Sequence, residues 1–98
     1  MNNNEKQNAP SANNIILFVS KHSLHFHLTV EEFNKLLIEL QKVQPFTSSI
    51  IDISENPEMA EKYKVDALPT LLVGSKRFIG IPETKRIMDE MDYTSSVS

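Results

Sequence analysis

The sequence predicts an α/β domain in which a four-stranded mixed sheet is flanked by helices, in the order βαβ-α-ββ-α. The first observation behind this prediction is an unbroken apolar run at residues 15–19, typical of a strand buried on both faces. The second is a helical stripe of apolar residues followed by a β-branched segment, which together complete a βαβ unit. Such a unit needs a right-handed crossover, so the first two strands are expected to be parallel.

The first helix is expected to begin at Thr29 and to end before Pro45. Thr29 and Glu32 have the spacing of a capping box, in which each side chain bonds to the other residue's backbone amide. The apolar residues after Thr29 recur every three or four positions and predict one buried face of a helix. They are Val30, Phe33, Leu36, Leu37, Leu40 and Val43.

A second strand and a short helix are expected next. Isoleucines within residues 50–53 supply β-branched side chains to a strand predicted over residues 49–54. Asn56 is a suitable N-cap for a helix that runs to about residue 64, and Pro57 is favoured in its first turn.

A hairpin and a last helix complete the predicted domain. Gly74-Ser75 separates two segments predicted as strands, 70–73 and 76–79, and is typical of a two-residue hairpin turn. This hairpin adds two antiparallel strands to the sheet. Pro82 is then expected to start the last helix.

The 98 residues are enough for one small domain, expected over residues 15–92. Residues 1–14 are rich in asparagine and have little to bury, so we expect a disordered N-terminal tail there. Residues 93–98 are similarly polar and are expected to fray.

The composition excludes several classes of function. The chain has no cysteine, so it can form no disulfide, thiolate metal site or redox-active dithiol. Its net charge of −3 offers nucleic acid no general attraction. It has neither the run of about 18 apolar residues that a membrane span needs nor the apolar core of a secretory signal. We therefore expect a cytoplasmic protein that binds neither nucleic acid nor membrane and needs no cofactor.

The order of the elements and two short motifs resemble the thioredoxin-like superfamily. The motifs are ALPTL at residues 67–71 and FIG at residues 78–80. In that superfamily the proline before the third strand is cis and faces the redox loop, a position that Pro69 takes here. Redox-active members carry Cys-x-x-Cys after the first strand, where this sequence has Ser23 and Phe26. The resemblance therefore implies a member without oxidoreductase activity.

Within this superfamily, the segment IDISENPEMAE at residues 51–61 is similar to the ID-x-x-x-NP-x-x-A stretch of the KaiB family. That family includes the cyanobacterial clock protein KaiB and the N-terminal domain of the sensor kinase SasA. The resemblance implies a non-catalytic domain that binds a regulatory partner, such as a KaiC-like RecA-type ATPase or a signalling kinase. KaiB reaches its thioredoxin-like form by refolding its C-terminal half. Whether a second fold is populated here and which oligomeric state the chain adopts are left open by the sequence.

The resemblance also places the partner-binding surface, because thioredoxin-like domains meet their partners around the cis-proline. Leu24 and Phe26, in the loop after the first strand, would form an apolar docking patch beside this proline if they are exposed, but they could equally pack inward over the sheet. The residues expected to contact a partner are His22, Ser23, Leu24, His25, Phe26, Leu68 and Pro69.

The main alternative is a domain without redox cysteines that has been repurposed to bind a metal ion or a glutathione-type ligand. His22, His25 and His27 are spaced so that two imidazoles could meet one Zn²⁺ or Cu²⁺ if the loop curls. No fourth ligand is evident, and solvated loop histidines are the simpler interpretation, so no metal site is predicted. Ser23 beside two histidines resembles a nucleophile next to a base, but an orienting acid and oxyanion donors are not signalled.

Overall fold

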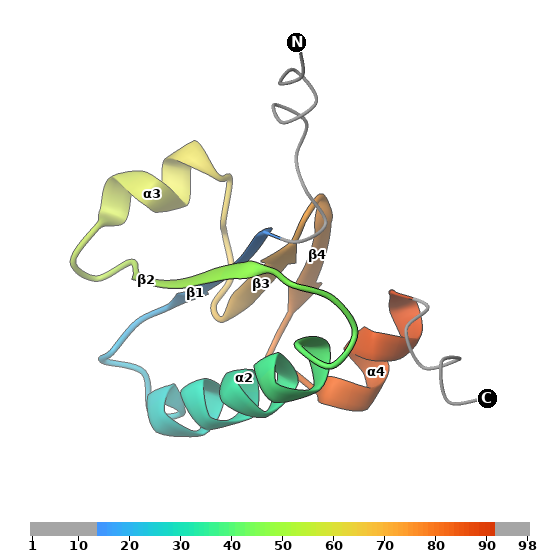
Figure 1. The fold of residues 1–98 in the computed structure, drawn as a ribbon. Coiled ribbons are helices and arrows are strands. Elements are labelled where there is room, and N and C mark those ends of the chain that lie inside the picture. The colour runs from blue at the N-terminus through green and yellow to red at the C-terminus, as the bar shows by residue number, and fades with distance from the viewer. Residues whose placement is uncertain (1–13, 92–98) are drawn as a thin grey trace, which may run out of the picture.

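The computed structural model describes residues 14–91, and the elements in this range follow the predicted βαβ-α-ββ-α order (Figure 1). The tails predicted at residues 1–14 and 93–98 lie outside the described residues, except for Asn14, which is the first residue of β1 and not part of a tail. No helix within residues 14–91 is long and apolar enough to cross a membrane. The elements are β1 (Asn14–Val19), α2 (Phe26–Leu40), β2 (Thr47–Asp52), α3 (Pro57–Lys62), β3 (Thr70–Val73), β4 (Lys76–Ile79) and α4 (Thr84–Glu90).

The strands form one mixed sheet in the order β2-β1-β3-β4. β1 pairs in parallel with β2 and antiparallel with β3, and β3 pairs antiparallel with β4. Helices α2 and α4 lie against one face of the sheet, whereas α3 lies on the other side (Figure 1). The predicted four-stranded mixed sheet with flanking helices is confirmed, and β2 and β4 form its two edges.

The main core lies between the sheet and the helices α2 and α4. β1 contributes Ile15, Leu17 and Val19, which share one face because side chains alternate along a strand. The other buried members of this core come from α2, β3, β4 and α4. They are Phe33, Leu36, Leu40, Leu71, Val73, Phe78, Ile87 and Met88.

The remaining apolar side chains of β1 are buried on the opposite face of the sheet. Ile16 and Phe18 lie there, and the Phe18 ring packs against Tyr63 with 5.2 Å between ring centroids. Since both faces of β1 are covered, the strand has the double burial that its unbroken apolar run predicts.

Helix α3 contains no buried residue, so the chain just after it provides its attachment. Lys64 has a φ of 57°, and the Val65 amide donates to the Ala60 carbonyl at 2.7 Å, which is the closing bond of a Schellman motif. Arg77 of β4 donates to the carbonyls of Tyr63 and Lys64 at 3.0 and 3.3 Å. A guanidinium at this position also complements the negative end of the helix dipole.

Helix α2 differs from the prediction at both ends. It begins at Phe26 rather than at Thr29, and the expected capping box does not form. Thr29 lies on the buried side of the helix, where its hydroxyl donates to the His25 carbonyl at 2.8 Å, a bond that threonine can make inside a helix. The helix ends at Leu40 and a turn follows it, so Val43 leaves the buried stripe and is exposed.

Strand β2 begins and ends two residues earlier than predicted, over Thr47–Asp52. It ends there because the chain turns, and the Asp52 carbonyl accepts hydrogen bonds from the amides of Glu55 and Asn56. Asn56 forms no side-chain cap for α3, since its Nδ2 donates to the same carbonyl at 3.2 Å. Helix α4 likewise begins at Thr84, two residues after the proline that was expected to start it.

Candidate functional site

The loop between β1 and α2, residues 20–25, is shaped by two serine side chains. The Ser20 hydroxyl accepts a hydrogen bond from the His22 amide, and the Ser23 hydroxyl accepts one from the His25 amide, each at 3.2 Å. The Ser23 amide also donates to the Ser20 carbonyl at 3.0 Å. Serine turns of this kind imitate a backbone turn. The β1–α2 loop therefore has a defined path before the helix begins.

The Leu68–Pro69 peptide bond is cis, the geometry that the resemblance implies at this position. The Thr70 hydroxyl is buried and donates to the Ala67 carbonyl at 2.6 Å. The Gly80 amide donates to the Pro69 carbonyl at 2.9 Å. These two hydrogen bonds hold the chain on both sides of the proline.

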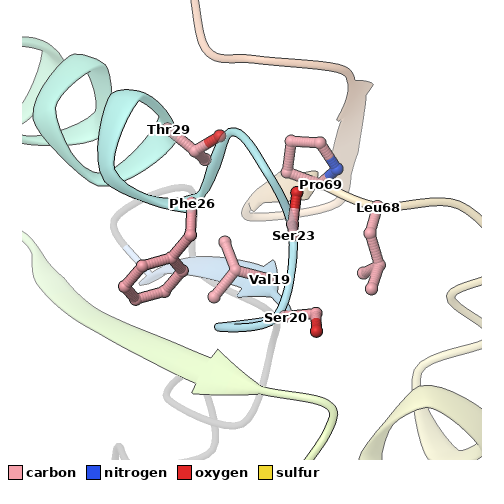
Figure 2. A pocket seen from close by; sticks show the side chains of 7 residues that line it. All are labelled: Val19, Ser20, Ser23, Phe26, Thr29, Leu68 and Pro69. Atoms are coloured by element: carbon pink, nitrogen blue, oxygen red, sulfur yellow. The ribbon is translucent and has the colours of Figure 1, made fainter.

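The β1–α2 loop and the Leu68–Pro69 segment line a shallow hollow (Figure 2). In Figure 2 the Ser23 and Thr29 side chains lie beside Pro69, whereas the Phe26 ring points away from it. The space that a water-sized sphere can occupy in this hollow is only about 10 Å³, roughly the room of one water molecule, so the hollow gives a glutathione-type ligand little room.

The residues that the sequence singled out fall into two groups. Ser23, Phe26, Leu68 and Pro69 line the hollow, whereas the others are exposed on the loop beside it and do not line it. That second group is His22, Leu24 and His25. Three lining residues were missed, because only residues 22–26 of this region were expected to face the proline. They are Val19 at the end of β1, Ser20 at the start of the loop and Thr29 in α2.

The surroundings of the hollow carry exposed apolar side chains. Leu24 in the loop is 94% exposed and Leu68 is 42% exposed. Leu28 is exposed as well and lies in the first turn of α2, whereas the predicted helix began after it, at Thr29. We refer to Leu24, Leu28 and Leu68 as the apolar rim.

Polar contacts fix the β1–α2 loop to the end of β2. Asp52 Oδ1 accepts hydrogen bonds from the Ser54 hydroxyl at 2.6 Å, the Ser54 amide at 3.0 Å and the Lys21 amide at 3.3 Å. The Lys21 ammonium forms an ion pair with Glu55. The Ser54 hydroxyl bond is the main cause that lowers the pKa of Asp52 below its usual value, and the hydrogen bond and charge of Glu55 raise the pKa of Lys21.

Replacing Asp52 with asparagine is expected to make the free energy of unfolding less dependent on pH in the acid range. The pKa of Asp52 in the folded state lies below its unfolded value of about 3.9. The carboxylate therefore stabilises the fold above that pH, and this contribution is lost as the pH falls through the folded pKa. Urea unfolding at pH values between about 2.5 and 7 measures the effect.

The wild type should lose more stability than Asp52→Asn as the pH falls below the unfolded pKa of about 3.9, because the unfolded chain then binds a proton at Asp52 before the folded chain does. Glu58→Gln serves as the control, because it removes an exposed carboxylate that takes no part in the contacts of Asp52. If the stabilities of the wild type and Asp52→Asn fell in parallel with pH, this role of Asp52 would be wrong.

The histidines of this region are exposed side chains without a metal-type arrangement. Within residues 14–91, no group of three or more histidine, aspartate or glutamate side chains is placed to hold a metal ion. The His27 ring packs edge-on against Phe26, with 5.4 Å between ring centroids. The Ser23 hydroxyl is engaged by the His25 amide rather than by an imidazole, so the loop does not present a serine nucleophile with its base.

Comparison with known proteins gives the family of the chain. The family model of the KaiB domain matches residues 16–80, from β1 to the residue after β4, and this range includes the β1–α2 loop and the cis-proline. No protein of curated function matches the sequence closely enough to count as a relative.

Solved structures of thioredoxin-like proteins superpose on most of the chain. Thioredoxin-2 of a malaria parasite has 17% identity and a TM-score of 0.67, over 81% of this chain and 80% of that one. The thioredoxin of Fasciola hepatica has 22% identity and a TM-score of 0.65, over 92% and 85%. The N-terminal domain of Synechococcus elongatus SasA has 20% identity and a TM-score of 0.60, over 85% and 83%.

At these identities the structural likeness shows the fold alone, which is thioredoxin-like. The family comes from the KaiB match, which spans well over half of the 98 residues. The absence of cysteine, which removes the redox pair of the thioredoxins, agrees with that assignment. The chain therefore belongs to the KaiB domain family.

Proposed function

We propose that this chain is a non-catalytic module that docks on a protein partner through the β1–α2 loop and the adjacent Leu68–Pro69 segment. The observation that carries the proposal is Leu24, which is 94% exposed on a loop of defined path. Large apolar side chains that an ordered surface displays together commonly mark sites of protein–protein contact. The rest of the apolar rim, Leu28 and Leu68, extends this surface.

The hydrogen bonds of the loop support the same function. The turns made by Ser20 and Ser23, and the contact between Lys21 and Asp52, already restrict the backbone before a partner arrives. A surface that is ordered in advance loses less conformational entropy on binding, so more of the contact energy appears as affinity. The loop therefore presents an exposed apolar side chain, Leu24, on a backbone that hydrogen bonds already restrain.

The partner that we propose is a KaiC-like RecA-type ATPase. Membership of the KaiB family and the structural likeness to the N-terminal domain of SasA support this class of partner. The proposal places the chain in the cytoplasm, where such a complex would form. No observation favours the metal or glutathione alternative, since the hollow is small and the loop histidines are exposed.

The double substitution Leu24→Asp with His25→Asp tests this surface. Two carboxylates at an apolar contact would have to be buried without partners, so we expect the affinity for a purified KaiC-like hexamer to fall at least about 30-fold, or about 2 kcal/mol. Biolayer interferometry with nucleotide present measures the affinity. The circular dichroism spectrum should stay that of the wild type, because both side chains are exposed.

Ile38→Asp is the matched control, because Ile38 is an exposed apolar residue of α2 outside the apolar rim. This variant should bind the hexamer as the wild type does. Equal binding by the double variant and the wild type would show that the interface does not include the β1–α2 loop. A wild-type chain that binds no KaiC-like hexamer with ATP or ADP would refute the partner class.

A further inference from the structure

Among the described residues 14–91, strand β2 forms an edge of the sheet that lacks the usual protection of edge strands. Its sequence, TSSIID, has no proline, lysine or arginine, and four of its six residues are exposed. The opposite edge, β4, is shorter and begins with Lys76-Arg77. Short length and basic residues are common means of preventing edge-to-edge pairing. β4 has both of these features, and β2 has neither.

The backbone groups that β2 presents outward follow from its pairing with β1. The Ile53 amide donates to the Val19 carbonyl at 2.8 Å, so odd-numbered residues here direct their backbone groups toward β1. By alternation, Ser48 and Ile50 direct their N–H and C=O groups away from the sheet. The Asp52 amide points outward as well, while its carbonyl serves the turn that follows. The edge thus offers donors and acceptors at every second residue.

We propose that β2 pairs antiparallel with β2 of a second copy of this chain, with Ile50 opposite Ile50 of the second copy. This register joins the two sheets into one across a two-fold axis, which is the commonest symmetry of homo-oligomers. It sets Ser48 of each copy opposite Asp52 of the other. All three pairs consist of residues with outward backbone groups, so the register uses the free edge of both copies.

The side chains favour a second copy over an unrelated strand, because the strand is complementary to itself in this register. Asp52 is the one charged residue of β2, and it meets Ser48 rather than its own equivalent, which avoids a like-charge pair. The hydrogen bonds that the Asp52 side chain accepts within residues 14–91 all reach Oδ1. Oδ2 is therefore left to accept the Ser48 hydroxyl of the second copy.

The exposure of Ile50 has a local cause that the pairing would remove. Ile50 pairs with Leu17 in the sheet, so it lies on the face that α2 covers, yet it remains 45% exposed. Helix α2 packs mainly against β1 and α4, and Ile50 on the outer strand is only partly covered on this face. In the proposed dimer the two Ile50 side chains cover each other directly across the two-fold axis.

The expected association is weak. An interface of two six-residue strands falls below the standard interface of about 1,600 Å², so we expect a Kd of about 10–1,000 μM. Sedimentation velocity over about 1–1,000 μM should show the mass rising from the 11.2 kDa of the monomer toward twice that value. A monomer throughout that range would overturn the proposal.

Cross-linking through Ile50→Cys tests the register itself. The chain contains no other cysteine, so an introduced thiol can only pair with that of a second copy. Opposed residues of a hydrogen-bonded antiparallel pair have Cα atoms about 5.5 Å apart, within the range that a disulfide spans. Ile50→Cys should therefore form a disulfide dimer rapidly under mild oxidation. Ile79→Cys, on the β4 edge and 57% exposed, is the matched control and should cross-link only slowly.

Equal rates of cross-linking for the two variants would refute the β2 interface. Ile50→Lys gives an independent check, because it would place two ammonium groups opposite each other and should abolish the dimer without unfolding the monomer. The double substitution Leu24→Asp with His25→Asp should leave the dimer intact. If that variant neither bound the ATPase nor formed the dimer, the assignment of self-association to β2 would be wrong. This conclusion would hold whether or not the proposed docking function is correct.

Discussion

Replacing Phe18 with alanine is expected to lower the free energy of unfolding by about 3–5 kcal/mol. Phe18 is fully buried in the central strand β1, between Ile51 of β2 and Thr70 of β3. Its ring lies on the face opposite the main core and packs against Tyr63, close to the attachment of α3. The substitution would leave a cavity on the face of the sheet that, among residues 14–91, the α3 region covers.

Chemical unfolding in urea measures this loss, which is a large part of the 5–15 kcal/mol typical of a whole domain. Phe18→Leu is the control, since it keeps most of the apolar volume and should cost less than about 1.5 kcal/mol. A loss below about 1.5 kcal/mol for Phe18→Ala would show that this face is loosely packed and that α2 and α4 alone support the sheet.

Elements with a strong local signal agree with the sequence prediction. The apolar run of β1 predicts burial on both faces, and the structure has Leu17 on one face and Phe18 on the other. The hairpin has the predicted strands, and Gly74 has a φ of 62° at the first position of its two-residue turn, as a type II′ turn requires. In both cases the determining residues lie within a few positions of each other.

The boundaries that were wrong depend on contacts with distant parts of the chain. Threonine is a residue type that often caps helices, but Thr29 lies on the buried side of α2. Its hydroxyl therefore donates to the His25 carbonyl instead of capping the helix. The predicted end of β2 failed because Asp52 starts a turn whose carboxylate also holds Lys21, 31 residues away. Secondary-structure propensity and residue spacing are local properties, so they do not predict such contacts between distant residues.

In the candidate site, too, some features follow from local sequence and others depend on the three-dimensional arrangement. The position of Pro69 and the loss of the redox pair follow from short motifs, so the general location of the surface could be inferred from the sequence. The exposure of Leu24, the contribution of Leu28 and the inward direction of Thr29 depend on where α2 begins. The free edge of β2 depends on the strand order, which the hydrophobic pattern alone does not determine.

Gly80→Ala is expected to lower the free energy of unfolding by about 1–3 kcal/mol. Gly80 has a φ of 104°, which residues with a side chain rarely adopt, and its amide holds the carbonyl of Pro69 at 2.9 Å. A Cβ at this position would have no heavy atom within 4 Å, so the cost arises from the backbone and not from a clash. Relief of the strain would require φ to change, and the hydrogen bond to the cis-proline segment would weaken.

Urea unfolding measures the stability of this variant, and amide hydrogen exchange at position 80 reports on the bond to Pro69, which should open more often than in the wild type. Ser75→Ala is the control, because Ser75 is exposed in the neighbouring hairpin turn and its loss should change stability by less than about 0.5 kcal/mol. If Gly80→Ala kept the stability and exchange rate of the wild type, the proline segment would not depend on this backbone conformation. A Gly80→Ala chain that is destabilised and also binds the KaiC-like hexamer more weakly would instead link the conformation at Gly80 to the docking surface beside Pro69.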